Sequence, residues 1–151
     1  MYSALDLAKY IVDYCYRMCK PISNLKLQKM LYFMWIDYYN KYNKLLFKEH
    51  FQAYKFGPMV PEVYYEFCSY AGVELRKNFE NIFKEETAED IENIIIIQDL
   101  IDKYIDVSVY EIVSKSTAKN GAWDIIYNNG GGSKNEIPFH LIRKLSNNIE
   151  E

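Results

Sequence analysis

The sequence predicts a mainly helical α+β fold, a single bundle of about six helices with a small antiparallel β element. Apolar residues recur every three or four positions through most of the chain, which indicates helices. Ser or Thr stands before several of these stretches, where a helix N-cap is expected. One short aromatic segment, residues 51–56, is bounded by Gly-Pro and favours an extended conformation.

The first two expected helices occupy most of residues 1–43. Ser3 can cap the first, and Pro21 ends it because proline cannot continue a helix. Ser23 caps the second, which we expect over residues 24–43. Apolar residues lie on two sides of this second helix, so we expect it to be central and well buried.

The next segment is expected to contain a strand, a tight turn and a third helix. Residues 51–56 form the extended part, which Gly57 and Pro58 close. Pro61 suits the first turn of the third helix, and Gly72 is a plausible stop.

Three more helices are expected after an irregular stretch at residues 73–86. Thr87 caps the fourth helix. Ser108 caps the fifth, which Gly121 can end, and Pro138 begins the last. The apolar residues expected on that last helix are Phe139, Ile142, Leu145 and Ile149.

Length and composition predict one cytoplasmic domain over residues 1–151. The chain is long enough for a hydrophobic core, and half of its residues are hydrophobic. No apolar run reaches the roughly 18 residues of a membrane span, and no basic and apolar leader begins the chain. The three cysteines have no disulfide spacing, so they fit a reducing compartment as small buried hydrophobes.

No group of residues predicts catalysis, a cofactor or a metal. The glycine run at residues 130–134 differs from a phosphate-binding loop, because Ser precedes Lys and the next helix begins several residues later. The cysteines and the two isolated histidines, His50 and His140, lack the spacing of zinc ligands. No pairing of a nucleophile with a base stands out. We therefore predict neither an enzyme nor a bound cofactor.

Two segments carry the most specific pattern in the chain. Residues 24–33 read NLKLQKMLYF, and residues 51–64 read FQAYKFGPMVPEVY. This pair resembles the signature of the Panacea-domain family, the SocA-like antitoxins often found in prophages. The family pattern is roughly NLKLQKLLYF followed by FxAWKYGPVVPxVY. Tyr54 stands where the family usually has Trp, and Phe56 where it usually has Tyr.

The resemblance implies an antitoxin that binds and neutralises a cognate protein toxin. Some relatives act as adaptors that deliver a toxin to a Clp-type protease, so the resemblance implies such a protease as a further partner. Both activities are protein–protein binding, which agrees with an aromatic chain without catalytic residues. Twelve of the 15 tyrosines lie in residues 1–70, and tyrosine is enriched at interfaces.

The two segments also supply the candidate site residues. Aromatic side chains would supply contact area, and charged side chains would fix the register of the complex. The predicted partner-facing residues are Lys26, Lys29, Tyr32, Tyr54, Lys55, Phe56 and Glu62. For Tyr32 and Phe56, packing of the helices against the turn is an equal alternative. Gly57, Pro58 and Pro61 are assigned to the shape of the turn.

The resemblance is weaker over residues 73–151. Ser108 to Trp123 follows the outline of a family stretch, but Ala118 stands where the family usually has His. Asn120 likewise stands where the family has an acidic residue. The role of that His in relatives therefore does not carry over to Ala118.

Two other functions stay open at this point. A prophage nucleic-acid-binding regulator could use Lys26 and Lys29 beside Tyr32, although the chain has a net charge of −3 and nucleic acid is not the expected partner. An enzyme with an unrecognised site near Trp123 and the glycine run would gather His140 or Glu136 in a cleft.

Overall fold

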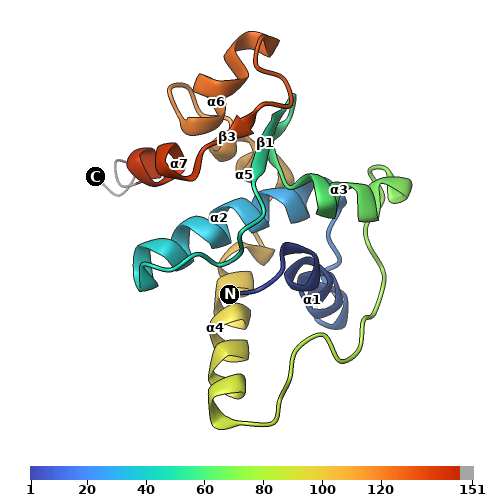
Figure 1. Ribbon diagram of the computed structural model, residues 1–151. Coiled ribbons are helices and arrows are strands. Elements are labelled where there is room, and N and C mark those ends of the chain that lie inside the picture. Colours follow the sequence, from blue (N-terminus) through green and yellow to red (C-terminus); the bar gives the residue numbers. More distant parts are fainter. Residues whose placement is uncertain (147–151) are drawn as a thin grey trace.

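The computed structural model describes residues 1–146, which form seven α-helices, two 3₁₀ turns and a three-stranded sheet (Figure 1). This confirms the predicted mainly helical α+β class. The elements in chain order are α1 (Ala4–Arg17), α2 (Asn24–Tyr42), β1 (Phe51–Tyr54), β2 (Gly57–Met59), α3 (Pro61–Phe67), η1 (Cys68–Tyr70), α4 (Ala88–Ile105), α5 (Val109–Ser116), α6 (Ala122–Tyr127), η2 (Asn128–Gly130), β3 (Glu136–Ile137) and α7 (Phe139–Ser146).

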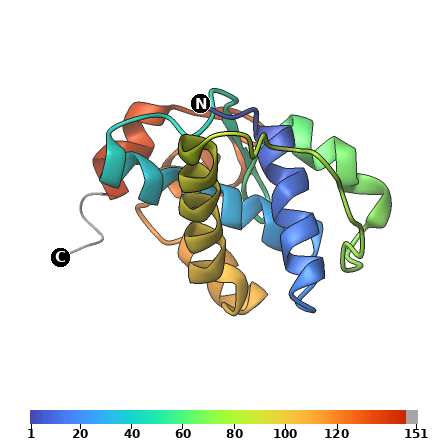
Figure 2. The same cartoon turned by 90° about the horizontal axis from the view of Figure 1, so that it is seen from below.

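Helix α2 lies at the centre of the molecule, as its two apolar sides predict. Figures 1 and 2 show α1 and α4 on one side of it and the sheet on the other. It contacts α1, α3, α4, α5, α7 and β2. The α2 side chains buried completely include Leu27, Met30, Leu31, Met34 and Trp35. Packing around this helix therefore determines where every neighbouring element lies.

Four helix starts follow the capping signals in the sequence. The side chains of Ser3, Ser23, Thr87 and Ser108 each accept a hydrogen bond from the backbone N–H three residues later. At Thr87 the bond is reciprocal, because Asp90 accepts from the Thr87 backbone N–H at 3.1 Å. These local bonds satisfy amides that have no partner inside the helix.

Several helix ends differ from the prediction. The fifth helix stops at Ser116, because the hydroxyls of Ser116 and Thr117 both donate to the Val113 carbonyl, at 2.9 and 2.8 Å. Gly121 is instead the N-cap of α6. The third helix stops at Phe67 and continues as η1, before Gly72 is reached.

Two smaller expectations about single residues have different outcomes. Cys15 is buried as expected, whereas Cys19 and Cys68 are exposed. Cys19 lies in the turn after the end of α1, and Cys68 is the first residue of η1. Ile149, expected on the last helix, lies outside the described residues.

The sheet has the order β2–β1–β3, and both pairings are antiparallel. Tyr54 pairs with Gly57 at the turn of the β1–β2 hairpin, and Phe51 pairs with Ile137 on the other side. The antiparallel β element was predicted from residues 51–56. The partner strands are only two and three residues long, too short to give a periodic signal.

A long irregular segment, residues 71–87, crosses from η1 to α4 and is called the strap below. Its irregular structure over residues 73–86 agrees with the prediction. Leu75 is buried and its N–H donates to the Ile22 carbonyl at 2.7 Å. Further along, the Phe83 ring lies 5.1 Å from that of Tyr2 and 5.0 Å from that of Tyr10. A few contacts thus hold the strap against α1 and against the residues on either side of that helix.

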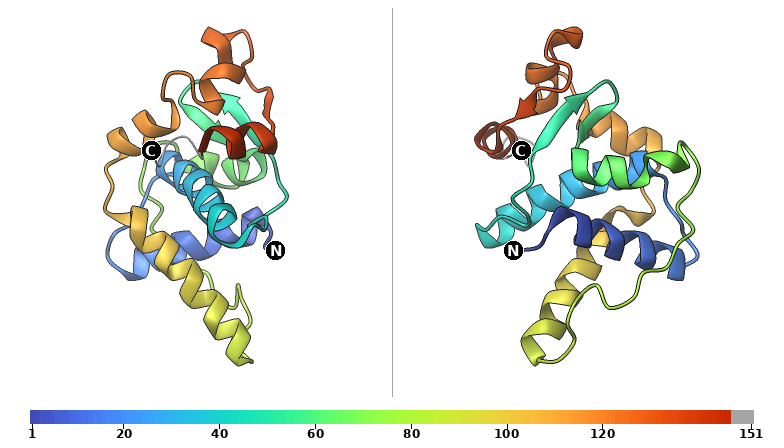
Figure 3. Two further views of the ribbon diagram at one scale, coloured as in Figure 1. Left: turned by 90° about the vertical axis from the view of Figure 1, so that its left-hand side faces the viewer. Right: turned by 45° about the vertical axis from the view of Figure 1, so that its right-hand side comes forward.

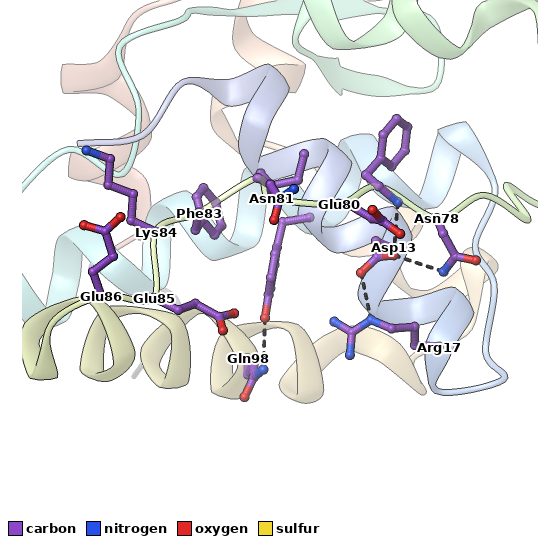
Figure 4. Close-up of a pocket in the computed structure, with 13 residues that line it drawn as sticks. Asp13, Arg17, Asn78, Glu80, Asn81, Phe83, Lys84, Glu85, Glu86 and Gln98 are labelled. Carbon is purple, nitrogen blue, oxygen red and sulfur yellow. Dashed lines mark hydrogen bonds and ion pairs between the residues drawn. The ribbon is translucent and has the colours of Figure 1, made fainter.

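Asp13 of α1 is the polar anchor of the strap (Figure 4). Its Oδ1 accepts hydrogen bonds from Asn78 Nδ2 at 3.0 Å and from the Phe79 N–H at 3.1 Å. Its Oδ2 accepts from Arg17 Nε at 2.7 Å. Burial opposes ionisation of Asp13, but the bonds from Asn78, Arg17 and Phe79 hold its pKa below the usual range.

We expect Asp13→Asn to lower the free energy of unfolding by about 1–3 kcal/mol at pH 7, because an amide cannot accept on both sides. The depressed pKa means that the carboxylate stabilises the fold above about pH 4 and loses this effect as pH falls through the folded-state pKa. Urea unfolding of both proteins from pH 7 to pH 3 should therefore show the gap closing. A gap independent of pH would contradict this role, and Asp99→Asn on exposed α4 is the control.

Candidate partner-binding site

Polar side chains on α2 face the chain that runs from the β1–β2 turn into α3. Gln28 is buried completely; it accepts from the Val60 N–H at 2.9 Å and donates to Asn24 Oδ1 at 3.1 Å. Asn24 in turn donates to the Tyr64 carbonyl at 3.3 Å. Val60 is the N-cap of α3 and has no side-chain cap of its own. Gln28 therefore binds the N-cap amide, as the third residue of a capping box does elsewhere.

Lys29 lies next to this pair, with 0% of its surface exposed. Its Nζ donates to the Pro58 carbonyl at 2.9 Å. Within the part of the chain that the structure describes, no ion pair involves Lys29. Burial without a counter-charge disfavours the ammonium form and lowers the pKa of Lys29 to about 7. The side chain thus holds the turn through a single strong contact with its backbone.

Gly57 provides the space that this lysine occupies. Its backbone has φ +116°, a conformation that residues with a Cβ rarely adopt. A Cβ at this position would lie 2.7 Å from Lys29 Cε and 2.9 Å from Ser116 Oγ. The turn, α2 and α5 therefore come into close contact at Gly57, which has no side chain. Pro58 follows within β2, and Pro61 is the first residue of α3.

Two more of the predicted partner-facing residues are buried. Lys26 Nζ donates to the Ile105 carbonyl at the C-terminal end of α4, where the helix dipole attracts a cation. Tyr32 packs edge-on against Phe51 of β1, with ring centroids 5.2 Å apart. Burial lowers the pKa of Lys26 and raises that of Tyr32. Because α2 is enclosed by its neighbours here, Lys29 offers a partner no surface, and Lys26 and Tyr32 are only 8% and 6% exposed. Tyr32 also lines the wall of a cavity of about 360 Å³.

The other four predicted residues lie together at the hairpin and the start of α3. Tyr54 is half-buried, whereas Lys55, Phe56 and Glu62 are exposed, Phe56 to 58%. The Lys55 ammonium lies over the Phe56 ring, 5.6 Å from its centroid. The right-hand view of Figure 3 shows the hairpin beside α3. Whether these residues contact a partner stays a prediction.

Sequence reasoning missed Tyr65, which extends the same surface. Tyr65 is 62% exposed on α3. The rings of Tyr54 and Tyr64 lie 5.8 Å apart, and those of Tyr64 and Tyr65 lie 5.4 Å apart. The only available signal was its place beside Tyr64 at the end of the second segment. We call Tyr54, Lys55, Phe56, Glu62 and Tyr65 the hairpin surface.

The other candidate chemistry is spread over the molecule. Glu136 Oε1 lies 3.1 Å from His50 Nδ1 at the surface, and His140 is exposed. Among residues 1–146, no three His, Cys, Asp or Glu side chains are grouped closely enough to hold a metal ion. A cavity of about 890 Å³ lies beneath the strap, and none of the predicted partner-facing residues lines it. No described helix has the length and apolar character needed to cross a membrane.

Comparison with known proteins identifies the family. The family model described as "Antitoxin SocA-like, Panacea domain" matches residues 27–124. The chain is also similar to antitoxin SocA of Caulobacter vibrioides, at 28% identity over 138 residues that cover 85% of this chain and 72% of that protein. No solved structure matches. The chain belongs to the SocA-like Panacea family, as the two segments predict.

We expect Lys29→Met to change how stability depends on pH. The lowered pKa means that the unfolded chain binds this proton more readily, so wild-type stability rises between pH 7 and pH 9. The slope from this group is at most about 1.4 kcal/mol per pH unit, and Lys29→Met should lack it. Chemical denaturation of both proteins at pH 7, 8 and 9 measures the difference. Parallel profiles would contradict a buried, neutralised lysine, and Lys55→Met is the exposed control.

We expect Gly57→Ala to destabilise the fold by about 1–3 kcal/mol from the backbone conformation alone. The methyl group would also overlap Lys29 and Ser116, which should add to the loss. Thermal and urea unfolding measure it. Gly72→Ala is the matched control, because no atom lies within 4 Å of a Cβ there, and it should be neutral or slightly stabilising. Equal effects at the two glycines would overturn the role of Gly57.

Proposed function

We propose that this Panacea-family chain is a cytoplasmic antitoxin that neutralises a cognate protein toxin by direct contact and not by catalysis. Membership of the SocA-like family, together with similarity to a protein named antitoxin SocA, is the observation that carries the proposal. The domain would comprise residues 1–151, and its genetic setting would be a prophage or a related mobile element.

The hairpin surface is the face that we assign to the toxin. Phe56 and Tyr65 are each more than half exposed. Large aromatic side chains release much free energy when a partner removes them from water, so these two can contribute strongly to binding. Lys55 and Glu62 place opposite charges beside them, which suits fixing the orientation of a partner. Aromatic side chains at the centre of an interface commonly supply most of its binding energy.

The scaffold beneath this surface is held in place before any partner arrives. Gln28 and Lys29 bind the backbone of the segment that joins the hairpin to α3, and Trp123 Nε1 donates to the Tyr54 carbonyl at 2.7 Å. A surface that is already ordered loses little conformational entropy on binding. The buried members of the two signature segments therefore support the exposed ones.

The first test is co-expression with the product of the neighbouring open reading frame. We expect that product to stop growth alone, and this chain to bind it in a pull-down and restore growth. Toxin half-life, measured with and without a Clp-type protease in the host, separates blocking from delivery. A harmless neighbour and no binding would contradict the proposal and favour the regulator or the enzyme.

We expect the double variant Phe56→Ser and Tyr65→Ser to bind the toxin about tenfold more weakly or worse, because it loses two aromatic anchors. Its melting temperature should stay near that of the wild type, since both side chains are exposed. Calorimetric titration and the growth assay measure the two effects. Ile91→Ser, at a residue 51% exposed on α4, is the control. Unchanged affinity of the double variant would exclude the hairpin surface.

A further inference from the structure

A groove follows the side of α2 that faces away from the strap, between α4, α5 and α7. It consists of two adjoining cavities of about 360 and 430 Å³. In the left-hand view of Figure 3, α2 lies between α5 and α7 on this side of the molecule. The residues that line both cavities are Phe33, Ile36, Lys115, Ala118 and Ser146. Two cavities with five shared residues form one continuous groove.

The interior of the groove is largely apolar. Phe33 and Ile36 of α2 line its whole length. One cavity is also lined by Ile142 and Leu145 of α7, and the other by Ile112 of α5 and by Val107, which precedes that helix. Apolar walls of this kind bind apolar side chains, because burial removes both surfaces from water.

Ala118 lies where the two cavities meet. The chain leaves α5 early, at Ser116, and turns towards α6 through exposed residues 118–120. Asn120 completes the turn with φ +65°, and its N–H donates to Asp124 Oδ2 at 2.9 Å. A methyl group at position 118 leaves the groove open, whereas a large side chain there would divide it.

The edge of the groove is positively charged. Lys103, Lys115 and Lys119 line it and are exposed, against one lining carboxylate, Asp37, among the described residues. Asp37 accepts from Lys103 at 2.9 Å and from the Tyr104 hydroxyl, and Lys115 forms an ion pair with Glu111 at 3.2 Å. Three lysines against these two carboxylates leave the edge with a net positive charge, and among the described residues Lys119 has no ion pair. The groove therefore complements a ligand that is apolar at its centre and negatively charged at its ends.

We propose that this groove receives a segment of the toxin in which apolar side chains are flanked by carboxylates. The inference rests on the proposed function and deepens it, because it names a second contact and its chemistry. The two cavities take two apolar side chains of one segment, and the lysines at the edge pair with its carboxylates. Phosphates of a nucleic acid would match the lysines but not the apolar walls.

Closing the groove tests the proposal. We expect Ala118→Trp to bind purified toxin about tenfold more weakly or worse, since the indole occupies the position of the apolar anchors. Ser114→Trp, at an exposed residue of α5 four positions earlier and outside both cavities, should bind normally. Thermal unfolding checks that both variants fold. Normal binding by a folded Ala118→Trp overturns the groove and leaves the antitoxin role intact.

A second variant keeps the test independent of folding. Lys115→Gln with Lys119→Glu changes only exposed side chains and places no second carboxylate beside Glu111, and we expect at least about tenfold weaker binding at low salt, converging with the wild type at high salt. Equal affinities at low salt would contradict the pairing with carboxylates. If wild-type protein itself fails to bind the toxin, the proposed function and this inference both fall.

Cross-linking identifies the occupant directly. A photoreactive phenylalanine derivative in place of Lys119, an exposed residue at the edge of the groove, should cross-link, in the complex, to a toxin peptide containing apolar residues beside Asp or Glu. Mass spectrometry reads out the peptide. A cross-link to residues 147–151 of this chain, to a toxin segment without carboxylates, or to nothing would overturn the proposal.

Discussion

The buried contact between Lys29 and the Pro58 carbonyl is the interaction on which the rest of the structure depends. It joins the central helix to the hairpin beside Gly57, where Lys29 and Ser116 fill the space that a side chain at position 57 would need. Placing an amine there without a carboxylate is unfavourable in itself, since desolvation penalises its charge. That cost is offset by the burial of the apolar residues around it, since every residue of α2 from 26 to 32 is buried.

The same contact also places the hairpin next to α5 and the groove. Ser116 lies on the far side of Gly57 and is also part of the wall of one groove cavity. The hairpin surface and the groove therefore share a structural boundary made by three residues, Lys29, Gly57 and Ser116. A change in the size of any of them would be felt on both faces, because packed interiors transmit small displacements.

The sequence predicted what local rules control. Helix starts followed from the hydroxyl side chains of Ser3, Ser23, Thr87 and Ser108, because capping needs only neighbours in the chain. The burial of α2 followed from its two apolar sides. The same two apolar sides also imply that Lys26 and Lys29 are buried, because an enclosed helix leaves its polar side chains no access to solvent. We predicted both at the surface because lysine is usually exposed.

Other features depended on contacts between distant segments. Strand β3 is two residues long and exists because β1 is there to pair with it. The groove forms because α5 ends at Ser116 and α7 packs against α2. The spacing of apolar residues in the sequence does not predict either feature. Lys55, Phe56 and Glu62 of the hairpin surface were candidates from the sequence because they lie in the second segment. Tyr65 was not, because its place beside them depends on how α3 packs.

Gln28, Lys29 and Gly57 make internal contacts that hold the hairpin and α3 against α2. These residues of the family motif therefore form the structural framework. Under the proposed function, the residues that choose a partner lie at exposed positions such as 55, 56, 65 and 119, some of them within the motif itself. In the proposed function, framework and recognition therefore use different side chains. Exchanging those few surface positions between two relatives should transfer the choice of toxin, while the internal residues keep the fold unchanged.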